Sequence, residues 1–229
     1  MGSNQLISII KFPVKIYNDL HVLLRAKSIR NGKAPWLNMN LFEIIWVHPD
    51  EIIGSLHRKD RLPAKLRGHT ISGDWDREYK KIEETTAFKV IDLRYRKGLS
   101  WEEIFQKHAE PHGFLTEKQI LKYREKIPLR EAVYKDLKES GWKTSINKKK
   151  SLLFCDELTV NVTRDGRLLR NNSGMHRLVM ARLLGLQRIP CLLHVVHSDY
   201  FRTSMNGDGQ PVKKLETTKA MGKDVEATV

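Results

Sequence analysis

A strand, hairpin, helix and strand in succession over residues 158–197 constrain the fold of this chain most strongly. Alternating apolar and polar residues over 158–163 predict a strand with one buried face. The pair Asp165-Gly166 predicts a hairpin turn into a return strand. A helix is predicted over 176–184, and the apolar run over 191–196 predicts a strand buried on both faces. The pattern predicts an α+β fold with a small mixed sheet.

The rest of the chain carries mainly helical signals. Ser100 and Glu103 form a capping-box pair ahead of an amphipathic run, and Gly141 is placed to end a later helix. A strand is predicted over 41–47, and Pro49 can open a short helix after it. Longer helices are predicted over residues 14–27, 83–97, 100–108, 116–126 and 129–140.

These elements suggest three parts of the 229-residue chain. Residues 1–40 are predicted to form an N-terminal helical extension. Residues 41–202 form the main domain, in which 53–126 is a helical insertion. Residues 203–229 are polar and contain little to bury, so we expect a mobile C-terminal tail.

The turn ahead of the 176–184 helix has the composition of an anion site. Asn172, Ser173 and Gly174 are small and polar, and they lie where a helix begins with unpaired backbone N–H groups. His176 and Arg177 follow in the first helical turn, where positive charge opposes the helix dipole unless an anion is bound. These five residues are therefore predicted to bind phosphate. The alternative is an ordinary helix start whose basic pair meets a carboxylate of the protein.

The stretch Asp165–His197 also resembles the core of the ParB/sulfiredoxin superfamily. The resemblance lies in the motif G-x-H-R-L-x-x-A-x-x-L-G-L-x-x-I-P. Within it, Gly174, His176 and Arg177 match the Gly-x-x-Arg element with which that superfamily binds nucleotide phosphates. Residues 46–52 resemble the first strand of the superfamily and the helix start that follows it. Residues 129–144 resemble its next helix. The resemblance covers about half of the chain and implies a ParB/sulfiredoxin-type sheet that binds a nucleotide.

Departures from these families narrow the expected activity. Met175 stands where sulfiredoxins carry their nucleophilic cysteine, so reduction of a cysteine sulfinate is not expected. No helix-turn-helix pattern follows the core, which argues against chromosome partition. The chain is most similar to ParB-like proteins that carry a Gly-Asp-Trp-Asp element ahead of the core.

That element supplies a second candidate site at Asp74 and Asp76. Two carboxylates that flank Trp75 could hold Mg²⁺ or act as a general base, and the two would point the same way in a strand. The alternative is a turn in which an Asp caps the next helix and Trp75 packs in the core.

Composition limits the setting and the partners. The formal net charge of +14 favours a polyanionic partner, and nucleic acid is one candidate. No run approaches the roughly 20 apolar residues of a membrane-spanning helix, so no membrane partner is expected. Cys155 and Cys191 each lie in an apolar run and are predicted to be buried thiols rather than a disulfide, which fits a cytoplasmic protein.

Three functions follow as hypotheses. The first is an NTP-dependent enzyme, either a Mg-dependent NTP hydrolase or a small-molecule phosphotransferase, that uses ATP or CTP. In it Arg177 would neutralise phosphate charge, His176 would contact a phosphate, and Asp74 or Asp76 would serve the metal or the acceptor. The second is a DNA-binding or nuclease protein of the ParB-like type. The third is a nucleotide-gated interaction module without turnover.

Overall fold

A single mixed sheet forms the centre of the protein. The computed structural model describes residues 44–143 and 157–204. The strands run in the order β1-β7-β5-β6-β2-β4, and β3 also pairs with β7. The pairs β5–β7, β2–β6 and β3–β7 are parallel, whereas the other three are antiparallel. The strands are β1 (Ile44–Val47), β2 (Ile52–Ser55), β3 (His69–Ile71), β4 (Lys80–Lys81), β5 (Leu158–Val162), β6 (Leu168–Asn172) and β7 (Ile189–His197).

Strand β7 lies at the heart of the sheet. All nine of its residues are buried, as its near-continuous apolar sequence predicts. One edge of β7 pairs with β5, and the other edge is shared by β1 and β3 in succession. Cys191 on this strand is a buried free thiol, which confirms that prediction. Cys155 lies outside the described residues.

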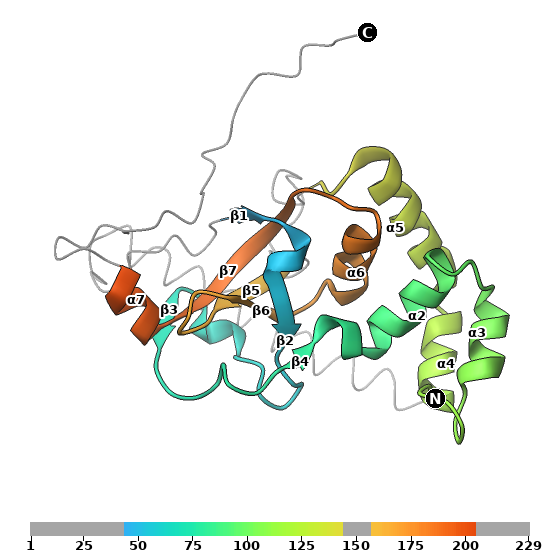
Figure 1. Cartoon of the computed structure of the whole chain (residues 1–229), viewed down its shortest axis with the longest axis horizontal. Coiled ribbons are helices and arrows are strands. Elements are labelled where there is room, and N and C mark those ends of the chain that lie inside the picture. Colours follow the sequence, from blue (N-terminus) through green and yellow to red (C-terminus); the bar gives the residue numbers. More distant parts are fainter. Residues whose placement is uncertain (1–43, 144–156, 205–229) are drawn as a thin grey trace, which may run out of the picture.

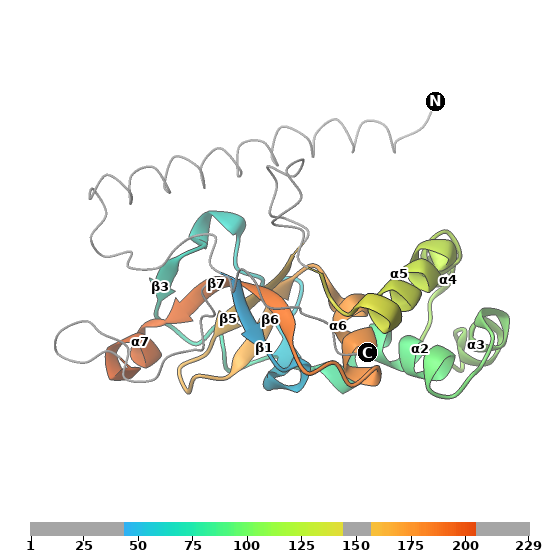
Figure 2. The same cartoon turned by 90° about the horizontal axis from the view of Figure 1, so that it is seen from above.

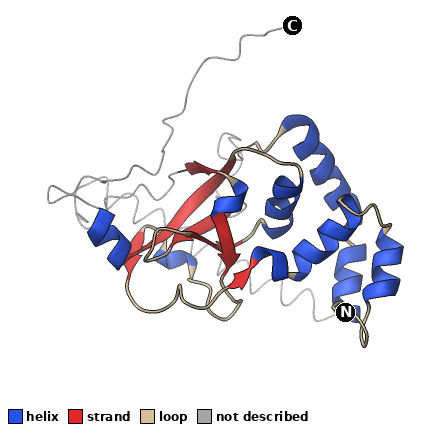
Figure 3. Cartoon of the chain, in the orientation of Figure 1, coloured by secondary structure: helices blue, strands red, loops and turns tan. Residues whose placement is uncertain are grey.

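Most helices gather on one side of the sheet. Figures 1 and 2 show α2 to α6 together at one side and α7 at the opposite end, and Figure 3 shows the strands between them. The helices are α2 (Thr86–Tyr95), α3 (Trp101–His108), α4 (Glu117–Arg124), α5 (Ile127–Ser140), α6 (Met175–Leu183) and α7 (Ser198–Ser204), and the short 3-10 turns are η1 (Pro49–Glu51), η2 (Ala64–Leu66) and η3 (Ile82–Glu84).

Local signals fix where several helices begin and end. Ser100 and Thr116 each accept a hydrogen bond from the backbone N–H three residues on, and each closes a capping box. Gly141 ends α5 at φ 65°, a conformation that glycine adopts without steric cost. The structure therefore confirms the helix starts predicted at Ser100 and Thr116 and the helix end predicted at Gly141.

The core joins the sheet to the helical side. Ile52, Val160 and Ile189 from the sheet are buried in the same cluster as Ile91 of α2 and Ile104 of α3. Burial of such side chains contributes about 1.5–3 kcal/mol each, so the helices on this side are held by apolar packing. None of the helices in the described part of the chain combines the length and the hydrophobicity needed to span a membrane.

The segment predicted as a helical insertion, 53–126, differs from that expectation in its first part. It is α-helical only from Thr86 onward, and the residues before it supply most of β2 together with β3 and β4. β3 and β4 are only three and two residues long, and neither has a buried side chain. Pairing with strands elsewhere in the chain defines them, and their local sequence gives no signal. The helix predicted over 14–27 and all but Thr203 and Ser204 of the predicted tail lie outside the described residues.

Candidate functional site

A pocket of about 510 Å³ opens between the N-terminal ends of α5 and α6. Helix α5 contributes its first two turns, and α6 contributes its first turn together with the polar turn that precedes it. Neither helix carries an acidic residue in its first turn. The lining residues are Lys126, Leu129, Arg130, Val133, Ser173, Gly174, Met175, His176, Arg177 and Met180.

The turn into α6 uses two consecutive residues with left-handed backbone. Ser173 has φ 52° and Gly174 has φ 65°. The Ser173 hydroxyl donates to the Glu157 carbonyl at 2.7 Å, and the Ser173 carbonyl accepts from Arg170 Nε at 2.9 Å. These two bonds hold a non-glycine residue in a conformation that costs of order 1–3 kcal/mol. The cost is typical of a functional turn.

Gly174 also leaves the start of α6 uncapped. The first bond of the helix runs from the Leu178 N–H to the Gly174 carbonyl at 2.8 Å. Gly174 has no side chain to accept from the N–H groups of Met175, His176 and Arg177, and no acceptor for them lies within the described part of the chain. Three backbone donors and the positive end of the helix dipole are therefore available to an anion.

Four cationic or basic side chains line the pocket: Lys126, Arg130, His176 and Arg177. Arg130 is only 8% exposed, yet its Nη1 donates to a neutral acceptor, the Tyr123 carbonyl, at 2.9 Å. Among the described residues, no carboxylate lines the pocket and none forms an ion pair with these four side chains. A buried guanidinium without a counter-ion is costly unless an anion joins it.

His176 is neutral in this pocket. Burial, together with the positive charges of Arg130, Arg170 and Lys126, lowers the pKa of His176 to about 4. Its Nε2 lies 3.1 Å from the Tyr123 hydroxyl, whose pKa burial raises to about 12. A protonated Tyr123 hydroxyl can donate to Nε2, which leaves the proton of the imidazole on Nδ1 as a donor for an anion.

Arg177 lies over the ring of Trp142, 5.1 Å from the ring centroid. This stacking restricts the guanidinium without neutralising its charge. Asn172 is placed differently from its predicted partners in the turn. It is exposed, does not line the pocket, and accepts from Arg61 Nη1 at 3.3 Å.

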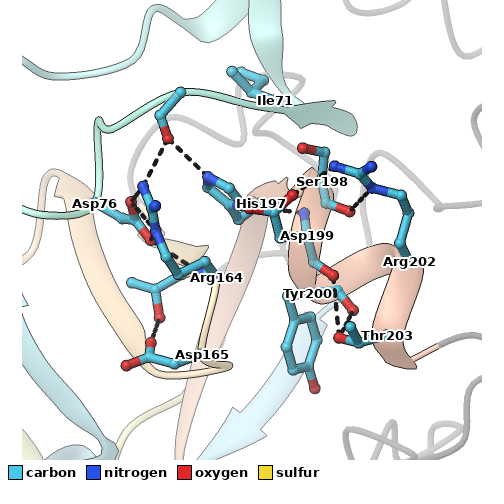
Figure 4. A network of polar contacts seen from close by, with 12 residues as sticks. Ile71, Asp76, Arg164, Asp165, His197, Ser198, Asp199, Tyr200, Arg202 and Thr203 are labelled. Atoms are coloured by element: carbon cyan, nitrogen blue, oxygen red, sulfur yellow. Dashed lines mark hydrogen bonds and ion pairs between the residues drawn. The ribbon is translucent and has the colours of Figure 1, made fainter.

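Asp74 and Asp76 lie at the other end of β6. Arg164, in the turn before β6, donates to both. Its Nη2 is 2.6 Å from Asp76 Oδ1 (Figure 4), and it is 2.9 Å from Asp74 Oδ1. Gly174 follows the opposite end of this strand, and five residues of strand span about 17 Å. The structure therefore does not bring the two carboxylates to the turn of Ser173 and Gly174, the predicted phosphate turn.

The contacts of Asp76 are those of a structural ion pair. Its side chain is 2% exposed, and it accepts from both the backbone N–H and the guanidinium of Arg164. Burial acts to raise the pKa of Asp76, but the hydrogen bonds from Arg164 outweigh it and hold the pKa below its ordinary value. Arg164 occupies the position that Mg²⁺ would need, so these carboxylates do not fit a metal site as they stand.

The rest of the Gly-Asp-Trp-Asp element packs against the end of β7. His197 Nε2 lies 2.8 Å from the Gly73 carbonyl, and the ring of Trp75 lies 5.7 Å from the His197 ring. The element thus clasps the β5–β6 turn to β7. In the described ranges no group of three or more His, Cys, Asp or Glu side chains gathers that could hold a metal ion.

Sequence reasoning missed Lys126, Arg130 and Tyr123 as site residues. A signal for two of them was present: Lys126 and Arg130 are basic residues at the start of a helix, the same conflict with the dipole that marks His176 and Arg177. Two such helix starts that face one pocket are a tertiary arrangement, and sequence spacing alone does not define it.

Comparison with known proteins found no family model, no curated protein and no solved structure that matches this chain.

Proposed function

We propose that the protein binds a nucleotide in the pocket between α5 and α6, with the phosphates at the N-terminus of α6. The observation that carries this proposal is the convergence of two helix N-termini and four basic side chains on a pocket whose described lining contains no carboxylate. Each element of that set favours negative charge. Together they would stabilise a polyanion far better than a single phosphate contact.

The apolar part of the lining supports a ligand with a flat, weakly polar body. Leu129, Val133, Met175 and Met180 lie opposite or beside the basic residues. Leu129 is 62% exposed, so its side chain is accessible to a ligand that enters the pocket. A nucleobase on these side chains, with its phosphates at the basic end, would use both parts of the pocket.

A ParB/sulfiredoxin-type fold belongs to the same proposal. Its support is the Gly174-x-His176-Arg177 motif on a strand–turn–helix unit, together with the mixed sheet. A phosphate bound there would contact the N–H groups that follow Gly174, and Arg177 would add a charged fork.

Binding has more support than turnover. Phosphoryl transfer needs a group that positions the attacking nucleophile and usually a metal held by carboxylates. The described lining of the pocket contains no carboxylate, and His176 is neutral with one nitrogen bonded to Tyr123. Among the three hypotheses, a nucleotide-binding protein without fast turnover therefore agrees best with the pocket.

Thermal unfolding with ATP, CTP and each other NTP, with and without Mg²⁺, tests the proposal. A nucleotide at about a hundred times its Kd stabilises the folded state by about 2.7 kcal/mol, which raises Tm by several degrees. Arg177→Ala is expected to remove most of this shift. Arg202→Ala, an equal change of charge on α7 at the far end of the sheet, should retain it. Absence of a shift with every nucleotide would overturn the proposal.

Hydrolysis measured on the same samples separates binding from turnover. We expect saturable binding with phosphate release no faster than in a sample without protein. Rapid release that Arg177→Ala abolishes would instead establish the enzymatic hypothesis, and the nucleotide-binding part of the proposal would still stand.

A further inference from the structure

A second group of basic residues lies beside the phosphate turn, on the loop between β2 and η2. This loop includes Arg58 and Arg61. Asn171 pins it to β6 by a pair of reciprocal bonds: its amide donates to the Leu62 carbonyl and its side-chain oxygen accepts from the Leu62 N–H, both at 2.9 Å. Because Asn171 is 3% exposed, the loop is held in place at this point rather than free to swing.

Arg61 is brought to the edge of the turn by this contact. Its Nη1 donates to Asn172 Oδ1 at 3.3 Å, and Asn172 stands two residues before Gly174, no more than about 7 Å along the chain. This neutral bond does not compensate the charge. Within the described residues Arg61 forms no ion pair, and its Nε is buried without a hydrogen-bond partner.

Arg61 of this loop and Arg170 of β6 both place positive charge beside the turn that begins α6, through their bonds to Asn172 and to the Ser173 carbonyl. Burial and the nearby Arg58 lower the pKa of Arg61, and burial and the nearby Arg61 lower the pKa of Arg170 to about 10. Arg170 in turn is one of the charges that lower the pKa of His176. Arg170 is 5% exposed and is bonded only to neutral partners, Ser55 and the Ser173 carbonyl, among the residues described.

We propose that Arg61 is a second phosphate-binding residue, and that the ligand of this protein carries a chain of linked phosphates reaching from the start of α6 past Asn172 to the 57–62 loop. This inference rests on the proposed function, since it assigns the first phosphate to the pocket. An isolated phosphate would neutralise only the α6 end of the series. A polyphosphate would also reach Arg61, whose partly buried guanidinium has a neutral acceptor in Asn172 and a like charge nearby in Arg58.

Inorganic phosphate and tripolyphosphate are the probes that test this inference, titrated by calorimetry at one fixed ionic strength. Tripolyphosphate should bind at least about ten-fold more tightly than orthophosphate, because each additional charge-assisted contact is worth a factor of this order. Arg61→Ala should remove most of that advantage. The affinity for orthophosphate should stay within about two-fold of that of the native protein. Arg61→Lys should restore part of the advantage.

Two variants keep the outcomes distinct. Arg202→Ala removes one charge far from the site and should leave both affinities unchanged, which controls for the net charge. Arg177→Ala should weaken the binding of both anions.

If orthophosphate binds through Arg177 but Arg61→Ala leaves the binding of tripolyphosphate unaffected, this inference is wrong and the proposed function stands. If neither anion binds, both are wrong. If Arg61→Ala weakens only a single-stranded oligonucleotide, the loop serves a nucleic acid and the inference is equally overturned.

Discussion

His176 illustrates how a residue's surroundings alter the role that its motif suggests. The sequence places a basic residue in the first turn of a helix, where a positive charge could meet phosphate. In the folded protein, burial and three neighbouring cations lower its pKa to about 4. His176 is therefore uncharged at neutral pH, with its Nε2 3.1 Å from the Tyr123 hydroxyl, and Arg130 and Arg177 supply the permanent positive charges of the pocket.

The pH dependence of stability follows from this pKa. Between pH 6.5 and 4 the unfolded chain protonates His176 and the folded protein does not, so the free energy of unfolding decreases as the pH falls through this window. The contribution is up to roughly 3 kcal/mol. Chemical denaturation at several pH values should show a smaller acid-induced loss for His176→Gln than for the native protein. The pKa of buried His194 is also lowered, but that effect is common to both proteins and cancels in the comparison. Parallel pH curves would contradict the burial of a neutral His176.

At the scale of elements, the turn before α6 depends on a glycine for two separate reasons. Gly174 has φ 65°, and a Cβ there would lie 3.1 Å from Leu158 Cδ1. Gly185, just beyond the end of α6, has the nearly identical φ 66°, but no atom lies within 4 Å of its Cβ position. Replacing either glycine would strain the backbone, but only a replacement of Gly174 would also crowd a neighbouring side chain, that of Leu158.

Gly174→Ala and Gly185→Ala form a matched pair. Each is expected to lower the free energy of unfolding by about 1 kcal/mol through backbone strain, with an additional loss for Gly174→Ala from the contact with Leu158. Denaturant unfolding measures these losses. Nucleotide binding should weaken in Gly174→Ala and stay unchanged in Gly185→Ala. Equal binding by both variants would separate the turn from the ligand site.

The elements predicted correctly from sequence are those with local signals. Ser100, Thr116 and Gly141 mark helix ends through short-range hydrogen bonds and backbone preference, and β7 is marked by its continuous apolar run. β2 was not predicted because it is four residues long and pairs with β6, more than a hundred residues further along the chain. The sequence predicted the pocket residues that belong to α6 and its preceding turn, because they form a motif. It did not predict those of α5, because their place in the pocket depends on how two helices meet.

At the scale of the whole molecule, strand β6 separates the two candidate sites of the sequence. The ion pairs of Asp74 and Asp76 with Arg164 form a clasp at one end of the strand, and the turn of Ser173 and Gly174 lies at the other. The enzyme hypothesis joined the two candidate sites, since spacing along the chain does not define which end of a strand a distant loop reaches. The clasp joins the loop after β3 to the β5–β6 turn, so its contribution is to the stability of the sheet.

Asp76→Asn tests this separation. Loss of a buried charge opposite Arg164 should lower the free energy of unfolding by about 2–4 kcal/mol, and nucleotide affinity should be unchanged in the protein that remains folded. Since the Asp76 pKa lies below its ordinary value, the ion pair stabilises the native protein above that value and is lost as the pH falls. The penalty of Asp76→Asn should therefore shrink in acid. A loss of nucleotide affinity of about ten-fold, with an unchanged free energy of unfolding, would show that Asp76 belongs to the ligand site.

The most direct test of a ligand in the α5–α6 pocket is an NMR titration of methyl-labelled protein with ATP and CTP. Met175, Met180 and Val133 line the pocket, whereas Val162 lies toward the clasp end of the sheet. We predict that the methyl signals of the three lining residues shift in a saturable way with at least one nucleotide and that the Val162 signals do not move. Shifts confined to methyl groups elsewhere, or no saturable shift with any nucleotide, would contradict the account.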